Sequence, residues 1–432
     1  MVTHLIADIL KLEPFSEIVI GGWISGVRKH RLDTFIDLRD ATGTIQVVVP
    51  NHLLSSATTL NKESAIRVYG NTKLAPKSSS IEVFANQVDV IASCPSDFEL
   101  NHGSNLLDPS LADFNLDFRH LNLRHPQLRG ALMFRHHFIG EAQNWFRTNG
   151  FIDISAPILT PVPLYDDSTA IKVNVKGDDV FLTQCVGFYL EAAAMAFGRV
   201  FNIGPSFRGE ESHSPRHLTE YWHVKAEMTW CRIDKIMIAA EQLVAHLALS
   251  CADIGSKVVP LWNETYGGHH INPPFERITY REAIARLNKR GFNIVFGSGL
   301  GQKEEEELAK DFSQPFWIVG NSRLVEPFPY IIDPSDSEIT MTADLIAPDG
   351  YGELLGTAEK ICDQQTLTER MIEKGKEDDQ RYDWVRQLRD FGCAPHGGFG
   401  MGLERTIRWL IHLPHVRDAI PFPRLFRRRI YP

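Results

Sequence analysis

Short stretches in which apolar and polar positions alternate fill the first hundred residues of the chain, and Gly, Asn and Pro separate them. Alternation with a period of two is typical of β-strands that bury one face. Five or so such strands in about 100 residues suit a small closed β-barrel, and they suit a small β-sandwich equally well. The stretches span residues 18–24, 34–40, 42–50 and 79–92.

The pattern changes at residues 94–114, where a strand-poor segment rich in turn-forming residues indicates a linker. Beyond it, apolar side chains recur at helical spacing over residues 128–145, and Asn149-Gly150 offers a C-cap. A second helix is predicted from Asp234 to about Cys251. We therefore assign residues 1–100 to a barrel domain of the oligonucleotide-binding (OB) type, 101–125 to a linker and 126–432 to a second domain.

Strand candidates in the second domain are grouped together and flanked by these helices, which favours an α+β fold on an antiparallel sheet. Near its end the chain is predicted to form a Gly-rich turn, GGFGMGL, that leads into a helix. Two acidic segments, residues 304–307 and 373–381, are predicted to be solvated helix faces. The strand candidates are 151–159, 179–184, 199–207, 315–320, 339–347 and 350–356.

The charge, the cysteine content and the apolar runs of the chain exclude some classes of protein. The 432 residues include 45 Lys and Arg against 54 Asp and Glu, a formal net charge of −9, which argues against a protein that coats nucleic acid but allows a local basic groove. Six scattered cysteines without a CxxC pair indicate reduced thiols in the cytoplasm. The apolar N-terminal run contains Asp8 and Lys11, and no apolar stretch approaches about 18 residues, so we expect neither a signal peptide nor a membrane partner.

Three segments of the second domain combine charge with features suited to phosphate chemistry. In FRGEESHSPRHLTEYWHVKAE, Arg208 and His217 could face a phosphate and Tyr221 could stack on a base, although an ion-paired surface hairpin fits the same pattern. Asp344 and Glu353 lie on neighbouring strand candidates, and paired carboxylates suit Mg²⁺, although paired acids on strands are common.

The third segment, HGGFGMGLERTIRWL, combines glycines that allow close approach of a ligand with Arg405 near the start of a helix. An arginine there could neutralise a polyphosphate and stabilise displacement at its α-phosphorus. A packing turn is the alternative. The spacing is neither that of a P-loop nor that of a dinucleotide-binding fingerprint.

Taken together, these motifs in this order behind a small barrel resemble the class II aminoacyl-tRNA synthetases, and most closely the asparaginyl branch of the aspartyl/asparaginyl group. NGFIDISAPIL, with Pro157, is similar to the dimer-forming motif of that family, and FRGEES…RHLTEYWHVKAE to its FRxE and RHLxE[FY] strands. GGFGMGLERTIRWL followed by VRDAIPFPR is similar to the third family motif, and GWISGVRKHR…TFIDLRDATGTIQVVV to the anticodon-binding OB barrel. The resemblance covers essentially the whole chain.

The resemblance implies attack of an amino-acid carboxylate on the α-phosphorus of ATP, followed by transfer of the acyl group from the adenylate to tRNA, in a homodimer. No covalent enzyme intermediate is needed, since positioning and charge neutralisation suffice. The implied ATP-binding residues are Arg208 at the α-phosphate, Glu210 orienting ATP and the amino acid, His217 and Arg405 at the terminal phosphates, Tyr221 on adenine, and Glu353 with Asp344 holding Mg²⁺. Of these, Arg208, Glu210 and Arg405 would be catalytic. In the barrel, Phe35 would stack on a base, Gln46 would read one, and Arg28, Lys29 and Arg31 would contact phosphates.

Three departures from the family pattern fall in the implied amino-acid pocket, which also includes Gln184. Gly187 replaces a glutamine of the family, Lys225 a glutamate that accepts hydrogen bonds from the asparagine amide, and Lys360 an arginine that holds the side-chain carbonyl. Two buried lysines would carry a charge of +2 with no partner unless the substrate is anionic. Burying two such unpaired ammonium groups would cost several kcal/mol or lower their pKa values. Asp166 and Asp167 are further candidates for the amino-group site.

These departures suggest a paralogue that activates a different amino acid, such as an acidic or larger one. Alternatively, the lysines point away and the pocket still takes asparagine. Two further functions compete with tRNA charging: a tRNA-independent amide ligase that passes the acyl group to ammonia, an amine or a peptide, and a non-catalytic RNA-binding relative. The barrel residues favour tRNA, the altered pocket favours the ligase, and the retained Arg208, Glu210, Glu353 and Arg405 argue against the non-catalytic relative.

Overall fold

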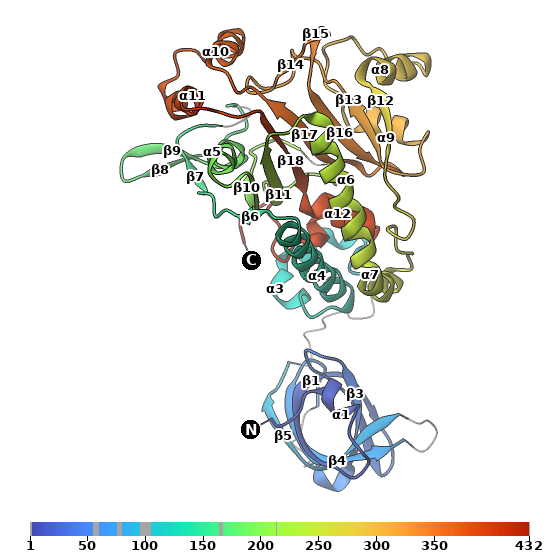
Figure 1. Cartoon of the computed structure of the whole chain (residues 1–432). Helices are drawn as coiled ribbons and strands as arrows, with labels where there is room; N and C mark the ends of the chain where they lie inside the picture. The colour runs from blue at the N-terminus through green and yellow to red at the C-terminus, as the bar shows by residue number, and fades with distance from the viewer. Residues whose placement is uncertain are drawn as a thin grey trace. The chain divides into compact units, whose positions relative to one another are not determined.

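The computed structural model describes residues 2–54, 60–75, 80–95, 105–163, 167–212 and 214–431. The chain divides into two compact units, Met1–Asn101 and His102–Pro432 (Figure 1).

Five strands close the first unit into a barrel in the order β1-β2-β3-β5-β4, which confirms the barrel and excludes the sandwich. Neighbouring strands are antiparallel except β3 and β5, which are parallel. Buried and partly buried positions alternate along β2, as the sequence pattern predicts. The elements are α1 (Ile6–Ile9), β1 (Glu17–Lys29), β2 (Asp33–Arg39), β3 (Thr44–Pro50), β4 (Ala65–Leu74) and β5 (Ile81–Ala92).

The second unit is built on an eight-stranded sheet in the order β12-β13-β16-β17-β18-β11-β10-β6, mostly antiparallel, which confirms the α+β class. Only the outermost pairs, β12 with β13 and β6 with β10, are parallel. The strands are β6 (Ile152–Asp153), β10 (Arg199–Phe207), β11 (Glu220–Thr229), β12 (Glu276–Thr279), β13 (Phe316–Val319), β16 (Thr342–Ala347), β17 (Gly352–Lys360) and β18 (His396–Gly402). Two small sheets join β7 (Leu159–Thr160), β8 (Lys172–Val175) and β9 (Asp178–Leu182), and β14 (Ile332–Asp333) with β15 (Asp336–Thr340).

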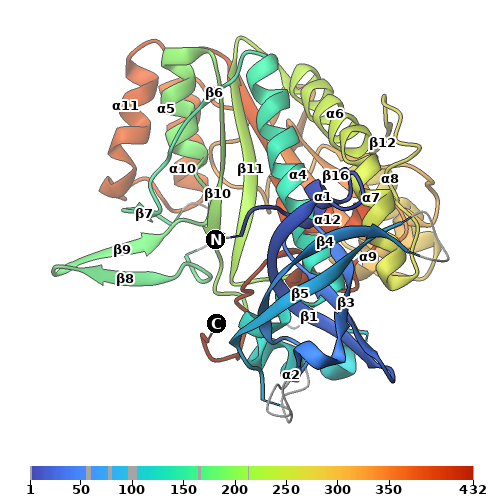
Figure 2. The same ribbon diagram turned by 90° about the horizontal axis from the view of Figure 1, so that it is seen from below.

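Helices flank this sheet, with α5 beside β10 and β11 on one side and α4 with α6 on the other (Figure 2). The two helices expected from apolar spacing are α4 (Pro126–Thr148) and α6 (Ile233–Ser250). The others are α2 (Ala112–Asp117), α3 (Arg119–Asn122), α5 (Gly187–Phe197), α7 (Ala252–Val258), α8 (Tyr280–Lys289), α9 (Gln302–Ala309), α10 (Gln364–Glu373), α11 (Asp383–Asp390) and α12 (Leu403–Leu410).

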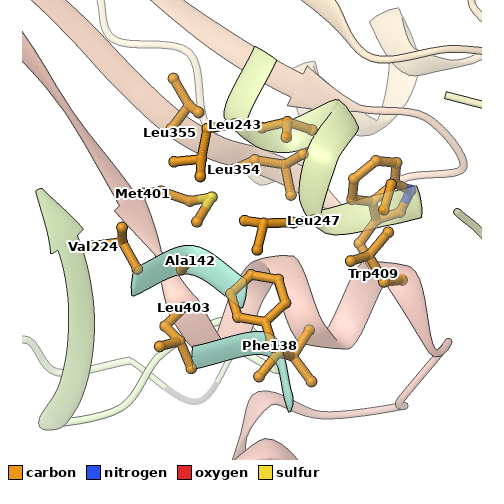
Figure 3. Packing of buried hydrophobic residues seen from close by; sticks show 14 of the residues in the cluster. Phe138, Ala142, Val224, Leu243, Leu247, Leu354, Leu355, Met401, Leu403 and Trp409 are labelled. Atoms are coloured by element: carbon orange, nitrogen blue, oxygen red, sulfur yellow. The ribbon is translucent and has the colours of Figure 1, made fainter. Parts of the chain in front are cut away.

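The main core lies between one face of the sheet and α4, α6 and α12. On β11, Val224, Ala226 and Met228 belong to this core, so the alternate residues of the strand face away from it. Figure 3 shows part of the packing, with Phe138, Ala142, Leu243, Leu247, Leu355, Met401, Leu403 and Trp409.

Residues 112–122, which the sequence pattern assigns to a linker, form α2 and α3 and belong to the second unit. The reason is long-range: the buried side chain of Arg119 donates hydrogen bonds to the backbone carbonyls of Arg417, Ile420 and Pro421, at 2.8–2.9 Å. Local composition carries no signal for such partners.

The Gly-rich segment is not the predicted turn but the strand β18, hydrogen-bonded between β11 and β17. Glycine is required at these positions because the backbones of the neighbouring strands lie too close for a side chain. A Cβ atom on Gly398 would lie 2.0 Å from the carbonyl oxygen of Ala226, and one on Gly397 would lie 2.4 Å from that of Ala358. Turn statistics for glycine therefore mislead here, because the residue is selected for close packing of backbones.

Two matched glycine variants test this account. Gly398→Ala forces a methyl group against backbone and should lower the free energy of unfolding by about 3 kcal/mol. In Gly400→Ala the three atoms nearest to the new Cβ all belong to the Lys225 side chain, the first at 2.9 Å, and none to backbone, so we expect a loss below about 1 kcal/mol. Urea unfolding measures both, and equal losses would contradict the account.

Among the described residues no single helix is both long and apolar enough to span a membrane. One pair of consecutive helices in the described residues would be long and apolar enough if taken together, but the two are bent by 52° relative to each other; they are Ile233–Ser250 and Ala252–Trp262.

Candidate functional site

The face of the sheet away from the main core carries a cavity of about 90 Å³. All six residues that the sequence motifs assign to ATP line it, although they come from four separate segments. They are Arg208, Glu210, His217, Tyr221, Glu353 and Arg405.

Positively and negatively charged side chains lie next to each other around this cavity. An Arg208 Nη1 atom lies 3.2 Å from Glu210 Oε1, and its guanidinium lies 5.9 Å from the centre of the Tyr221 ring. Arg405, in the first turn of α12, ion-pairs with Glu353 across 3.2 Å. The arginines thus lie beside an aromatic ring and two carboxylates, a set suited to a nucleotide with its phosphates.

His217 contributes to the cavity as a neutral imidazole. Burial and the charge of Arg405 lower its pKa to about 4, against the opposing influence of Glu210. Its Nδ1 atom lies 3.0 Å from the Ser212 hydroxyl and 2.9 Å from the Ser214 hydroxyl. The ring can therefore offer a hydrogen bond to a phosphate without a charge of its own.

Glu305 is a functional residue that the sequence pattern missed, because the prediction that residues 304–307 form a solvated face is wrong for it. Its carboxylate is buried, 2.5 Å from Arg216 Nη1, and accepts the backbone N–H of Glu353 at 3.0 Å. Arg216 in turn offers its carbonyl to Arg405 at 3.4 Å. Glu305 therefore ties the start of β17 to the loop that carries His217.

Asp344 and Glu353 converge on one point above β17. A Cβ atom at Gly356 would lie 3.0 Å from Asp344 Oδ1 and 3.7 Å from Glu353 Oε1. Burial, together with the charges of Glu353 and Glu326, raises the pKa of Asp344 well above its usual value. A cation would relieve this repulsion, so the pair fits a divalent ion. Within the described residues no group of three metal-binding side chains converges.

A second cavity, of about 190 Å³, adjoins the first, because Arg208, His223, Glu353 and Gly400 line both. It brings together Gly187, Lys225 and Lys360, the three positions that depart from the family pattern. Gln184, the fourth predicted pocket residue, is not part of the lining; it is buried and donates to the Thr169 hydroxyl at 2.9 Å.

The strand register explains how these residues meet. Lys225 and Glu227 are two apart on β11 and face the same side of the sheet, opposite Gly400 and Gly398 of β18. The glycine strand thus forms a floor without side chains, over which the neighbouring strands extend theirs. A Cβ atom at Gly398 would lie 2.6 Å from Glu227 Oε2.

The predicted unpaired charge of +2 is wrong, because two carboxylates neutralise Lys360. Its Nζ atom lies 2.8 Å from Glu227 Oε2 and 3.1 Å from Glu191 Oε1. Burial opposes the charge on Lys360, but these carboxylates more than offset it and raise its pKa. Lys225 Nζ donates to Cys185 Sγ at 2.5 Å. Glu191 comes from α5 and Glu227 from β11, so adjacency to the lysines is a property of the fold and not of any local motif.

Comparisons with known proteins identify the family of the chain. The family model for class II tRNA synthetases (D, K and N) matches residues 112–425, and that for the OB-fold nucleic acid binding domain matches residues 18–91. The chain belongs to the class II tRNA synthetases. It is similar to an asparagine–tRNA ligase of Pyrococcus furiosus, with 32% identity over 96% of both chains.

Solved structures of synthetases show the same architecture. The asparaginyl-tRNA synthetase of Pyrococcus horikoshii complexed with asparaginyl-adenylate matches with a TM-score of 0.91 and 31% identity over 97% of each chain. That of Entamoeba histolytica, also with asparaginyl-adenylate, matches with a TM-score of 0.86 and 25% identity over 97% of each chain. The fold is therefore that of a synthetase along essentially its full length.

The barrel of this synthetase presents its predicted tRNA-binding residues on three adjacent strands. Phe35 of β2 lies opposite Arg28 of β1, and its ring forms a T-shaped pair with His30, with the ring centres 5.3 Å apart. Arg28 forms a two-fold hydrogen bond with Asp37, at 2.8 and 3.0 Å, and also donates to Gln46. Lys29 and Arg31 are exposed.

Of the two remaining candidates for the amino-group site, Asp166 lies outside the described residues. Asp167 is half exposed and ion-pairs with Lys376 across 2.8 Å. It is not part of the lining of either cavity.

Proposed function

We propose that this synthetase binds ATP in the first cavity and an amino acid in the second, and that the amino-acid carboxylate attacks the α-phosphorus of ATP to give an aminoacyl-adenylate and pyrophosphate. The acyl group then passes to the terminal ribose of a tRNA. The observation that carries the proposal is the junction of the two cavities, where Arg208 and Glu353 belong to both linings.

The chain's own residues act by positioning and charge. Arg208 at the junction neutralises the α-phosphate as negative charge develops in the transition state. Glu210, which ion-pairs with Arg208, orients the Arg208 guanidinium. His217 and Arg405 bind the terminal phosphates, and Tyr221 stacks on adenine. Asp344 and Glu353 would hold Mg²⁺, which offsets phosphate charge when bound.

Further support favours a tRNA acceptor, a dimer and a cytoplasmic enzyme. Phe35 and Gln46 lie in a barrel of the nucleic-acid-binding type. The edge strand β6 and the segment around Pro157 expose apolar side chains, Ile152, Ile158 and Leu159, which an antiparallel partner would cover. All six cysteines are free, as expected in a reducing compartment.

The experiment is ATP–pyrophosphate exchange with each of the twenty amino acids, followed by charging of bulk tRNA. Exchange with at least one amino acid, and charging with the same one, is the expected result. Asparagine as clearly the best substrate would show that the three departures leave the specificity of the relatives unchanged, and another amino acid would support a changed pocket. Exchange without charging would support the amide ligase, and no exchange with any amino acid contradicts the proposal.

A variant of the barrel separates the two steps. Phe35→Ala removes a stacking surface worth about 1–3 kcal/mol per base, so KM for tRNA should rise by about 10-fold or more. Pyrophosphate exchange should stay unchanged because Phe35 belongs to the other compact unit. The exposed Leu32→Ala on the same barrel is the control. An equal effect of both variants on charging would contradict the stacking role.

A further inference from the structure

A thiol and an amine lie in direct contact at the wall of the second cavity. Lys225 Nζ donates to Cys185 Sγ at 2.5 Å, and both residues are buried, with exposed fractions of 8% and 2%. Lys225 lines the cavity, whereas Cys185 lies just behind the lining, on the segment that leads into α5. Adenylate formation as proposed above gives this thiol no role.

Three features of the surroundings favour the thiolate form of Cys185. The ammonium group of Lys225 contacts the sulfur, the backbone N–H of Gly187 donates to it at 3.2 Å, and α5 begins two residues further along the chain. A neighbouring cation and a helix N-terminus both stabilise a thiolate, which is the reactive form of cysteine. Burial lowers the pKa of Lys225, but Cys185 and Tyr330 more than offset this and raise it, so the amine stays charged beside the sulfur.

Two other buried thiols have a different environment. Burial raises the pKa of Cys231 and that of Cys251 to about 12, so both remain protonated and unreactive. Within the described residues, Cys185 is also the only cysteine whose sulfur lies within hydrogen-bond distance of a lysine. An oxidant should therefore react with Cys185 in preference to these thiols.

The sulfur of Cys185 is open to small molecules in the cavity because Gly187 has no side chain. A Cβ atom on Gly187 would lie 3.3 Å from Cys185 Sγ and 3.6 Å from Lys360 Nζ. Gly187 lines the cavity, whose volume is about 190 Å³, so a longer side chain there would stand between the sulfur and the open space. Hydrogen peroxide is only slightly larger than water, and a cavity of this size with polar walls admits it.

We propose that Cys185 and Lys225 form a site of reversible oxidative modification, at which hydrogen peroxide links Sγ to Nζ. The thiolate attacks one oxygen of the peroxide, so that sulfur loses two electrons and becomes a sulfenic acid while hydroxide leaves. Hydroxide takes a proton from the Lys225 ammonium. The neutral amine then displaces a second hydroxide from sulfur and gives it a proton, as a backbone nitrogen does when it condenses with a sulfenic acid. The products are an S–N bond and two molecules of water, and a reducing thiol restores both side chains.

The bridge changes the wall of the second cavity. In the reduced pair Lys225 presents an ammonium group there, whereas in the oxidised pair its nitrogen is neutral and bonded to the segment before α5. Because a charged donor binds more strongly than a neutral one, oxidation should weaken adenylate formation. The covalent step is independent of the proposed function, and only this consequence rests on it.

The test exposes the whole chain to hydrogen peroxide, alkylates the remaining thiols, digests the chain without a reducing agent and analyses the peptides by mass spectrometry. We expect a linked pair of the peptides that contain Cys185 and Lys225, about 2 Da lighter than their sum, which dithiothreitol separates. Pyrophosphate exchange, measured with the amino acid that exchanges fastest, should fall by about 10-fold or more after oxidation and return with dithiothreitol.

Two variants assign the effect to this pair, each compared with its own untreated rate. Cys185→Ser should lose the linked pair and the reversible part of the inhibition, whereas Cys94→Ser, in the other compact unit, should respond as wild type. Absence of the linked pair from oxidised wild type, or equal reversible inhibition of Cys185→Ser and wild type, overturns the inference. A linked pair in a chain that shows no exchange even before oxidation would support the inference and overturn the proposed function alone.

Discussion

Arg208→Ala should slow ATP–pyrophosphate exchange about 10³-fold, the largest catalytic effect expected of any single residue here. Among the described residues, Arg208 is the only Arg or Lys that lines both cavities, and its guanidinium also lies near the Tyr221 ring. In the proposed reaction it therefore lies where the carboxylate and the α-phosphate would meet. Because the interaction strengthens as charge develops, the loss should appear in kcat more than in KM for ATP.

Arg199→Ala is the matched control: Arg199 begins β10, whereas Arg208 follows its last residue, and the Arg199 guanidinium packs on Phe151 outside both cavities. It should exchange at the wild-type rate. Arg208→Lys should fall between the two, because lysine keeps the charge but not the planar, two-pronged donor. An Arg208→Ala rate within about tenfold of wild type would remove Arg208 from the mechanism.

Glu191→Gln should destabilise the second unit by about 3–5 kcal/mol, the largest stability effect expected. Its fully buried carboxylate lies 2.7 Å from Arg389, 3.1 Å from Lys360 and 3.3 Å from His396. Removing this negative charge takes one anionic partner away from each of three buried cations, Lys360, Arg389 and protonated His396. Urea unfolding of the whole chain measures the loss, with Glu369→Gln as control, and a change below about 1 kcal/mol would contradict the network.

The same cluster gives stability a pH dependence of known sign. Burial opposes charging of His396, but hydrogen bonds with Cys393 and Glu191 and the charge of Glu191 raise its pKa to about 9, from 6.5 in the unfolded chain. A raised pKa stabilises the fold fully below pH 6.5 and no longer does so once pH passes 9. Wild type should therefore lose up to about 3 kcal/mol over this window, and Glu191→Gln much less. Parallel pH profiles for the two proteins would contradict this assignment.

Sequence motifs name all six residues that the structure gathers around the first cavity, from the connection between β10 and β11 and from β11, β17 and α12. They fail where a partner comes from a distant segment without a local signal. Glu305 looks like one more acid in a charged helix, and Glu326 lies in an unremarkable loop, yet each fixes a neighbour in the site.

Glu191 did leave a signal, since it is the only charged residue of the otherwise apolar helix GFYLEAAAMAF. A lone charge in an apolar helix predicts a buried ion pair. Recognising it would have supplied Lys360 with a partner and removed the apparent excess of positive charge. The glycines of β18 mislead for a related reason, because contact between strands rather than a turn requires them.

The central claim is that a carboxylate oxygen attacks the α-phosphorus of ATP, and isotope transfer tests it most directly. The enzyme is given ATP, tRNA and an amino acid labelled with ¹⁸O in its α-carboxylate: asparagine first, then whichever amino acid exchanges fastest. Mass spectrometry of the products should find one ¹⁸O atom in AMP and none in pyrophosphate, because the bridging oxygen of the adenylate stays with AMP when the acyl group leaves. Unlabelled AMP, or ADP with labelled phosphate, would contradict the account.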